Sequence, residues 1–93
     1  MGADTNSGMT ADVGAQIRRV LNEVGRLPLD ANELDDRADL YLAGMSSHAS
    51  VDVMIELEDT FGIEFPAQML NRSVFESIAA IAAAVYELKR SAA

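Results

Sequence analysis

The chain has 93 residues, enough for one small domain but too few for two. Its 15 acidic and 7 basic residues give a net charge of −8, which argues against nucleic acid or an anionic membrane as the main partner, because Lys and Arg are the usual ligands of phosphate. There is no cysteine, so neither a disulfide nor a thiolate metal site can form, and any thiol chemistry needs an added group.

Neither a membrane span nor an export signal is predicted. No apolar run approaches the roughly 20 residues of a span, and residues 1–10 lack both a basic and an apolar region, so we expect a cytoplasmic protein. Residues 1–9 are small and polar, and we expect them to be a disordered lead before a folded domain at residues 10–90.

A first helix is predicted from Thr10, whose hydroxyl suits a helix cap, to Gly25, a residue type common just past a helix end. Asp12 in its first turn is favourable at the positive end of the helix dipole. Its apolar residues recur at helical spacing and should face the core: Val13, Ile17, Val20, Leu21 and Val24.

A long loop follows, from residue 26 to residue 43. We expect three leucines to hold it against the core, namely Leu34, Leu40 and Leu42, with a short turn at residues 39–42 before Gly44. The acidic stretch DANELDDRADLY lacks the alternating acids, central glycine and terminal glutamate of a calcium loop, so no metal site is predicted.

A second helix is predicted from Ser47 to Phe61. One face is apolar and should be core: Val53, Met54, Leu57 and Phe61. Val51 and Ile55 lie on a neighbouring face, in line with His48. Residues 47–65 contain no Lys or Arg but five acids: Asp52, Glu56, Glu58, Asp59 and Glu64.

The rest of the chain predicts a short helix and a long one. Pro66 should begin the short helix, which ends near Leu70, and Ser73 with Glu76 forms a capping box for the last helix. One stripe of that helix should be core: Val74, Ile78, Ile81, Val85 and Leu88. Three long helices and a short one, with a long loop between the first two, predict an all-α class and a small four-helix bundle.

The run GMSSHASVDVMIELEDTFGIEFP, residues 44–66, resembles the acyl carrier protein family. That family has a Gly-x-Asp-Ser-Leu type motif, then a helix ending in Leu-Glu-x-x-Phe and a loop ending in proline. Here Leu57, Glu58 and Phe61 match the helix end, and counting back from Leu57 puts Ser47 at the family's attachment serine. Ser46 then replaces the usual aspartate and His48 the usual leucine. The resemblance extends from residue 11 to about residue 88.

The resemblance implies a carrier protein without catalytic residues. A phosphopantetheinyl transferase, with magnesium in its own site, would move 4'-phosphopantetheine from coenzyme A to Ser47. The thiol of that arm would hold an acyl or aminoacyl group as a thioester, and the chain, as a monomer, would present it to a loading ligase and a downstream acceptor enzyme.

The cargo is predicted from two segments. Residues 44–66, together with MLNRSVFESIAAI at residues 69–81, look closer to the discrete aminoacyl carrier proteins, which are charged with a small amino acid by a stand-alone ligase similar to the catalytic core of seryl-tRNA synthetase. The alternative is an acyl carrier for specialised lipid, polyketide or nonribosomal peptide synthesis. The residues around Ser47 argue against the main fatty-acid synthase, whose carriers usually keep Asp-Ser-Leu there.

The acidic helix is expected to dock basic enzymes. In the family such positions meet Arg and Lys of partner enzymes, and we expect six docking residues: His48, Val51, Asp52, Ile55, Glu58 and Asp59. A solvated charged face is the other reading of the acids. From the residues alone, Ser46 and Ser47 could also be a simple cap pair, in which case the chain is an unmodified acidic helical module that binds a protein. A Ser47–His48 dyad is disfavoured because neighbours on a helix point about 100° apart.

Overall fold

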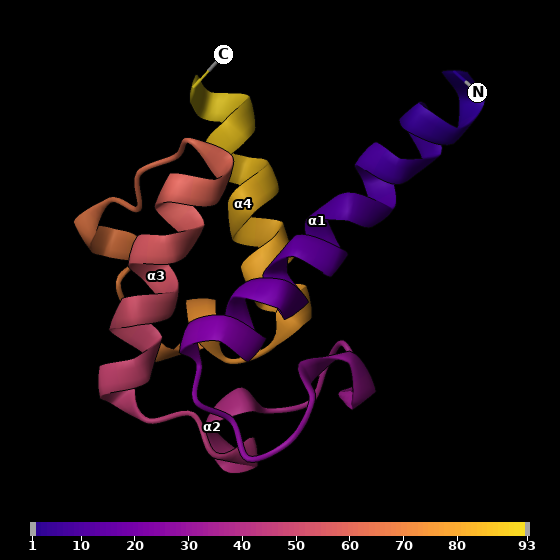
Figure 1. Cartoon of the computed structure of the whole chain (residues 1–93). Helices are drawn as coiled ribbons and strands as arrows, with labels where there is room; N and C mark the ends of the chain where they lie inside the picture. The colour runs from indigo at the N-terminus through magenta and orange to yellow at the C-terminus, as the bar shows by residue number, and fades with distance from the viewer. Residues whose placement is uncertain (1, 93) are drawn as a thin grey trace.

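The computed structural model describes the backbone of residues 2–92 and the side chains of residues 13–91, and it is all-α over that range. It has four α-helices: α1 (Gly2–Val24), α2 (Leu40–Ala43), α3 (Ser47–Phe61) and α4 (Ile78–Ala92) (Figure 1). Three single turns of 3₁₀ helix lie between them: Ala31–Glu33, Ala67–Met69 and Arg72–Phe75. The predicted class, with three long helices and a long first loop, is therefore confirmed.

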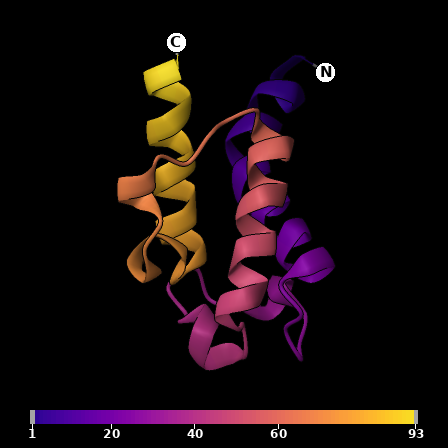
Figure 2. The same ribbon diagram turned by 90° about the vertical axis from the view of Figure 1, so that its left-hand side faces the viewer.

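The core lies between α1, α3 and α4, and α1 packs against both of the others (Figures 1 and 2). The apolar stripes predicted from the sequence supply the side chains of this core. Its largest fully buried side chains are Ile17, Val20 and Leu21 of α1, Leu40 of α2, Val53 and Leu57 of α3, and Ile81 and Val85 of α4. Burial of each such side chain contributes roughly 1.5–3 kcal/mol to folding, and no charged or polar residue is buried among the described side chains.

Helix α1 begins at Gly2 rather than at the expected cap Thr10. Residues 2–9 contain no proline, so no backbone N–H is missing there and the helical hydrogen bonding continues upstream, away from the bundle (Figure 1). The helix ends at Val24, next to Gly25, as predicted. The division into a lead at residues 1–9 and a domain at residues 10–90 stays a prediction.

Polar side chains of α1 hold the long loop. Arg18 Nη1 donates hydrogen bonds to the carbonyl oxygens of Ala31 at 2.6 Å and Leu34 at 2.8 Å, while its Nη2 pairs with Asp36 Oδ1 at 2.5 Å. The Arg18 side chain is only 18% exposed. The chain thus fastens its first loop to α1 through one guanidinium that donates to two loop carbonyl groups, of which that of Ala31 also accepts from the Leu34 N–H.

A second polar anchor lies one turn further along α1. The side-chain oxygen of Asn22 accepts from the Ala31 N–H at 2.8 Å, and its amide donates to Asp30 Oδ1 at 3.1 Å. The backbone N–H of Asn32, and then the Asn22 amide, lower the pKa of Asp30 against a smaller opposing effect of desolvation. Because these donors favour the charged form, their support is present near neutral pH and is lost as the pH falls through the lowered pKa.

The three leucines of the loop differ in burial. Leu40 is fully buried and Leu34 packs against the core, but Leu42 is 84% exposed, so its predicted role in holding the loop is wrong. The reason is that Asp39 caps residues 40–43 as helix α2, accepting from the Tyr41 and Leu42 N–H groups. A residue two positions further along a helix is rotated by about 200° around the helix axis, so Leu42 points outward when Leu40 points inward.

The segment between α3 and α4 also departs from the prediction (Figure 2). Ser73 and Glu76 do not start the last helix: Ser73 Oγ donates to Asn71 Oδ1, and Asn71 caps the 3₁₀ turn of residues 72–75. Helix α4 starts after Ser77, whose hydroxyl accepts from the Ala80 N–H at 3.1 Å. The 3₁₀ turn brings Phe75 into the core, 5.2 Å from the ring centre of Phe65. Packing of this ring explains why the α-helix begins later than expected.

The loop after α3 is attached through a carboxylate. Helix α3 ends at Gly62, which has the left-handed φ of 64° that favours glycine. Beyond it, the Phe65 N–H donates to Glu58 Oε2 at 2.9 Å, and Ile63 and Phe65 are buried. Glu58 therefore has a structural function. Over the described residues, no helix combines the length and the apolar character needed to cross a membrane.

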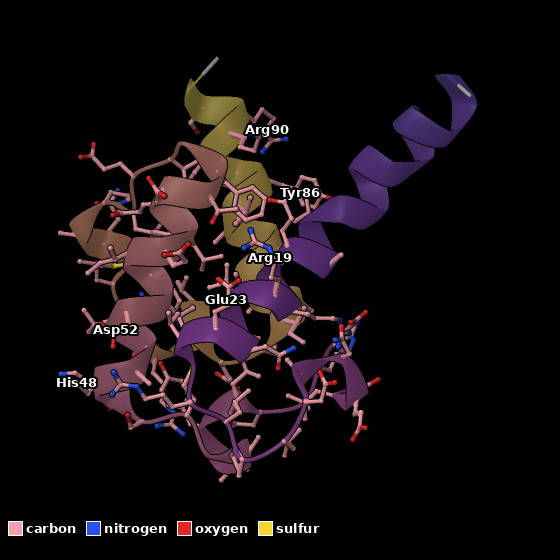
Figure 3. The ribbon with its side chains drawn as sticks, in the orientation of Figure 1. Arg19, Glu23, His48, Asp52, Tyr86 and Arg90 are labelled. Atoms are coloured by element: carbon pink, nitrogen blue, oxygen red, sulfur yellow. The ribbon has the colours of Figure 1, made fainter. Side chains whose placement is uncertain are left out.

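Replacing Arg18 tests the first anchor. The variant Arg18→Ala removes the guanidinium donor from two loop carbonyl groups, and we expect it to lower the free energy of unfolding by about 1–3 kcal/mol in urea titrations. Arg19→Ala is the control, because Arg19 is half exposed and pairs with Glu23 on the surface (Figure 3), so a loss below about 0.5 kcal/mol is expected. Equal losses in the two variants would contradict the anchoring role.

Replacing Glu58 tests the second loop attachment. Glu58→Ala removes the acceptor of the Phe65 N–H and should cost about 1–2 kcal/mol, whereas Glu58→Gln keeps a side-chain oxygen and should cost less. Asp59→Ala, at the exposed neighbouring acid, should change stability by less than about 0.5 kcal/mol. Denaturant midpoints measure all three, and a Glu58→Ala midpoint equal to that of Asp59→Ala would refute the assignment.

Candidate functional site

The two serines at the start of α3 have different functions in the structure. Ser46 is the N-cap, with extended backbone angles, and its Oγ accepts from the Ala49 N–H at 3.0 Å. Ser47 is the first residue of the helix, and its side chain is exposed. Its hydroxyl makes no hydrogen bond with any side chain or backbone group of the described residues. One serine thus stabilises the helix, and the next is left accessible.

The preceding turn places these serines at the end of the bundle. Gly44 has φ 127°, and a Cβ atom there would lie 2.7 Å from Pro28 Cδ, so the position requires glycine for both backbone angle and space. Met45 is buried, and its N–H donates to the Leu40 carbonyl at 2.9 Å. The turn is therefore held from within, and α3 begins with its hydroxyls on the outside.

Four of the six expected docking residues lie together on α3 near Ser47. Val51 and Ile55 are 51% and 55% exposed, and the His48 side chain is 80% exposed. Asp52 lies beside them, with its Oδ2 3.9 Å from His48 Nδ1 (Figure 3). We call His48, Val51, Asp52 and Ile55 the docking strip. It presents two apolar side chains next to a carboxylate.

Glu58 and Asp59 lie further from Ser47. Glu58 is eleven positions after Ser47 along α3, which corresponds to a rise of about 16 Å. One Glu58 oxygen already accepts from the Phe65 N–H, whereas Asp59 is exposed and has no ion-pair partner among the described side chains. The structure therefore does not bring the six expected residues into one cluster.

Two arginines that were not expected from the sequence also contribute to this region. Arg26, just after α1, has a left-handed φ of 57°, and its Nη2 lies 3.6 Å from Asp52 Oδ2. Arg72 lies over the ring of Tyr41, with its Cζ atom 4.2 Å from the ring centre. Each pair joins residues far apart in the chain, so no local pattern of residues could have indicated either contact.

An open groove begins at Ser47. On the α3 side it is lined by Ser47, Ser50, Val51 and Met54. Tyr41, residues 70–72 and Phe75 line the opposite side, and the volume is about 470 Å³. We call this hollow the serine groove. It places the free hydroxyl of Ser47 at the edge of a partly apolar surface.

The start of α3 suits a phosphate ester. The first N–H groups of a helix have no partner within the helix and point outward with the positive end of the dipole, which favours an anion there. Ser46 satisfies only the Ala49 N–H. An exposed hydroxyl at the first helical residue thus fits a covalently attached phosphodiester without any rearrangement of the core.

The comparisons with known proteins agree with this geometry. Residues 15–85 match the family described as a phosphopantetheine attachment site. An aminoacyl carrier protein of Agrobacterium fabrum is 49% identical over 69 residues, which cover 74% of this chain and 83% of that protein.

Solved structures are similar as well. One is the crystal structure of a complex between an engineered glycine:carrier protein ligase from Bradyrhizobium japonicum, a carrier protein from Agrobacterium tumefaciens and ATP. The matched chain in that structure is 47% identical to this chain, with a TM-score of 0.78, and the match covers 81% of this chain and 97% of the matched chain. A solution structure of an A. tumefaciens protein gives a TM-score of 0.68, 45% identity, and coverage of 86% and 99%. The chain belongs to the phosphopantetheine-attachment family of carrier proteins, which hold a covalent prosthetic group and have no catalytic activity of their own.

Proposed function

We propose that Ser47 carries the 4'-phosphopantetheine arm and that the chain presents an aminoacyl group, held as a thioester, to partner enzymes. The observation that supports this most directly is the exposed hydroxyl of Ser47, free of the capping bond that Ser46 makes. The chain contains no cysteine, so the arm supplies the one thiol that a thioester needs. A cytoplasmic location stays a prediction.

The chain's own residues act as a substrate in the modification. A free hydroxyl is a weak nucleophile, and the only neighbouring base, His48, lies beside Asp52 on the next face of the helix. The transferase therefore has to bring its own base and magnesium. The Ser47 oxygen would attack the β-phosphate of coenzyme A, form the phosphodiester, give its proton to the transferase base and release adenosine 3',5'-bisphosphate.

Partner enzymes would dock on α3. We propose the six residues expected from the sequence, with the docking strip closest to the arm and Asp59 as the outlying acid. Val51 and Ile55 supply exposed apolar area, and the acids attract Lys and Arg on the enzyme. Exposed charges are screened by salt, so this docking should be weak and reversible, which a carrier needs because it has to leave each enzyme.

The cargo proposal follows the relatives. The aminoacyl carrier protein is 49% identical, and the similar carrier protein was solved with a glycine:carrier protein ligase. We propose that a stand-alone ligase of that kind charges this chain with a small amino acid and that a downstream acceptor enzyme removes it. The chain acts as a monomer in this proposal.

Intact mass tests the attachment site. After treatment with a promiscuous phosphopantetheinyl transferase and coenzyme A, we expect a mass gain of one phosphopantetheine. Ser47→Ala should abolish the gain, whereas Ser46→Ala, which loses a helix cap worth about 1 kcal/mol, should keep it. Ser50→Ala, on the same turn, is the matched control. A gain that persists in Ser47→Ala would place the attachment at another residue, and no gain in the unchanged protein would leave only the unmodified binding module.

Loading tests the cargo and the docking strip. We expect the holo protein to accept glycine or another small amino acid from ATP and the B. japonicum glycine ligase. At carrier concentrations below saturation, Ile55→Ala should lower the loading rate roughly fivefold or more, as for a central interface residue. The loading rate at saturating carrier should change little. Glu33→Gln, at an exposed position in the 3₁₀ turn Ala31–Glu33 that packs against α1, should load normally.

The opposing outcomes for this experiment are distinct. Failure with every amino acid, together with loading by an acyl ligase, would replace the aminoacyl proposal by the acyl one. Equal slowing by Ile55→Ala and Glu33→Gln would refute docking on α3.

A further inference from the structure

Arg26 occupies a backbone position that favours glycine. Its φ of 57° is left-handed, a region in which a Cβ atom costs free energy, and it is the only residue other than glycine with a positive φ in the described part of the chain. The neighbouring Gly25 is needed for space instead, because a Cβ atom there would lie 2.6 Å from the Leu21 carbonyl oxygen. An arginine kept in a strained conformation points to a use for its side chain.

The side chain of Arg26 reaches the docking strip. Its Nη2 atom lies 3.6 Å from Asp52 Oδ2, and neither a hydrogen bond nor a second ion pair joins its guanidinium to the described residues. The Arg26 side chain is 68% exposed. At this distance the pair is too long for a hydrogen bond, so Coulomb attraction alone holds it, and solvent weakens that attraction. The one carboxylate of the docking strip is therefore paired loosely and can be released at little cost.

This pair changes the charge that the docking strip presents. Arg26 balances the charge of Asp52 under all ordinary assay conditions, since a guanidinium is not deprotonated in proteins. His48, whose Nδ1 lies 3.9 Å from the same carboxylate oxygen, adds positive charge whenever it is protonated. The surface next to Ser47 is thus close to neutral, although the whole chain has a net charge of −8. A Lys or Arg of a partner enzyme has to displace Arg26 to pair fully with Asp52.

We propose that Arg26 is an intramolecular competitor for Asp52 and thereby lowers the affinity of the docking strip for a loading ligase that presents a Lys or Arg to this carboxylate. The proposal rests on docking at α3. An enzyme that pairs with Asp52 breaks the Arg26 contact, so the apparent affinity falls by the fraction of carrier in which that contact is formed. The apolar contacts of Val51 and Ile55 are unaffected. Such weakening suits a carrier that has to leave each enzyme.

The kinetics of loading test this proposal, with holo protein verified by intact mass and the B. japonicum glycine ligase. Arg26→Gly should lower the KM for the carrier roughly two- to fivefold, the range for an exposed ion pair, and leave kcat unchanged. Its fold should be retained, because glycine readily adopts a left-handed backbone. Arg26→Gln removes the charge without introducing glycine and should lower the KM in the same way. Arg26→Lys keeps a cation and should keep most of the original KM.

Two controls separate competition from a general effect of charge. In an Asp52→Asn background, Arg26→Gly should change the KM much less, because no carboxylate is left to compete for. Arg19→Gln removes an arginine that pairs with Glu23 on α1, away from His48 and Asp52 (Figure 3), and should leave the KM unchanged.

The opposing outcomes are separate from those of docking itself. A KM that Arg26→Gly and Arg26→Gln leave unchanged would overturn the competition. So would a KM that they raise, as for an arginine that contacts a carboxylate of the enzyme, or an equal effect in the Asp52→Asn background. If Ile55→Ala raises the KM in the same assay, docking on α3 stands even when the Arg26 variants have no effect. If Ile55→Ala also leaves the KM unchanged, docking on α3 fails as well.

Discussion

The hydrogen bond from the Ala49 N–H to Ser46 Oγ is the constraint on which the functional end of the molecule depends. Because Ser46 satisfies this donor, helix α3 can begin without help from the next hydroxyl, and Ser47 is left exposed. The turn before it is held by the positive φ of Gly44 and by the buried Met45. A stable bundle thus ends in one free hydroxyl, which is what a transferase needs in a substrate.

The charges of this protein serve two separate purposes. Arg18 and Glu58 each fasten a loop to a helix, and their polar atoms are engaged inside the fold. Asp59 stays free toward solvent, while Asp52 already has an arginine of the same chain beside it. A row of acids in the sequence is therefore not uniformly available to a partner, and the proposed docking surface is smaller and more apolar than the net charge of −8 suggests.

The groove and the docking strip share one side of α3. Val51 belongs to both of these surfaces. Arg72, stacked on Tyr41, lines the groove, and Arg26 lies beside Asp52 of the docking strip, so each surface has a cation next to it.

The sequence by itself determined the features that depend on near neighbours. Helical spacing predicts the three long helices and their buried faces, and the register back from Leu57 picks out Ser47, because periodicity and capping act within about four residues. Only the tertiary structure decided the pairing of Arg26 with Asp52, the stack of Arg72 on Tyr41 and the exposure of Leu42. These contacts join segments that are distant along the chain, or follow from a short helix whose orientation is set by packing. Local pattern carries no information about them, since they exist only once the helices are assembled around a common core.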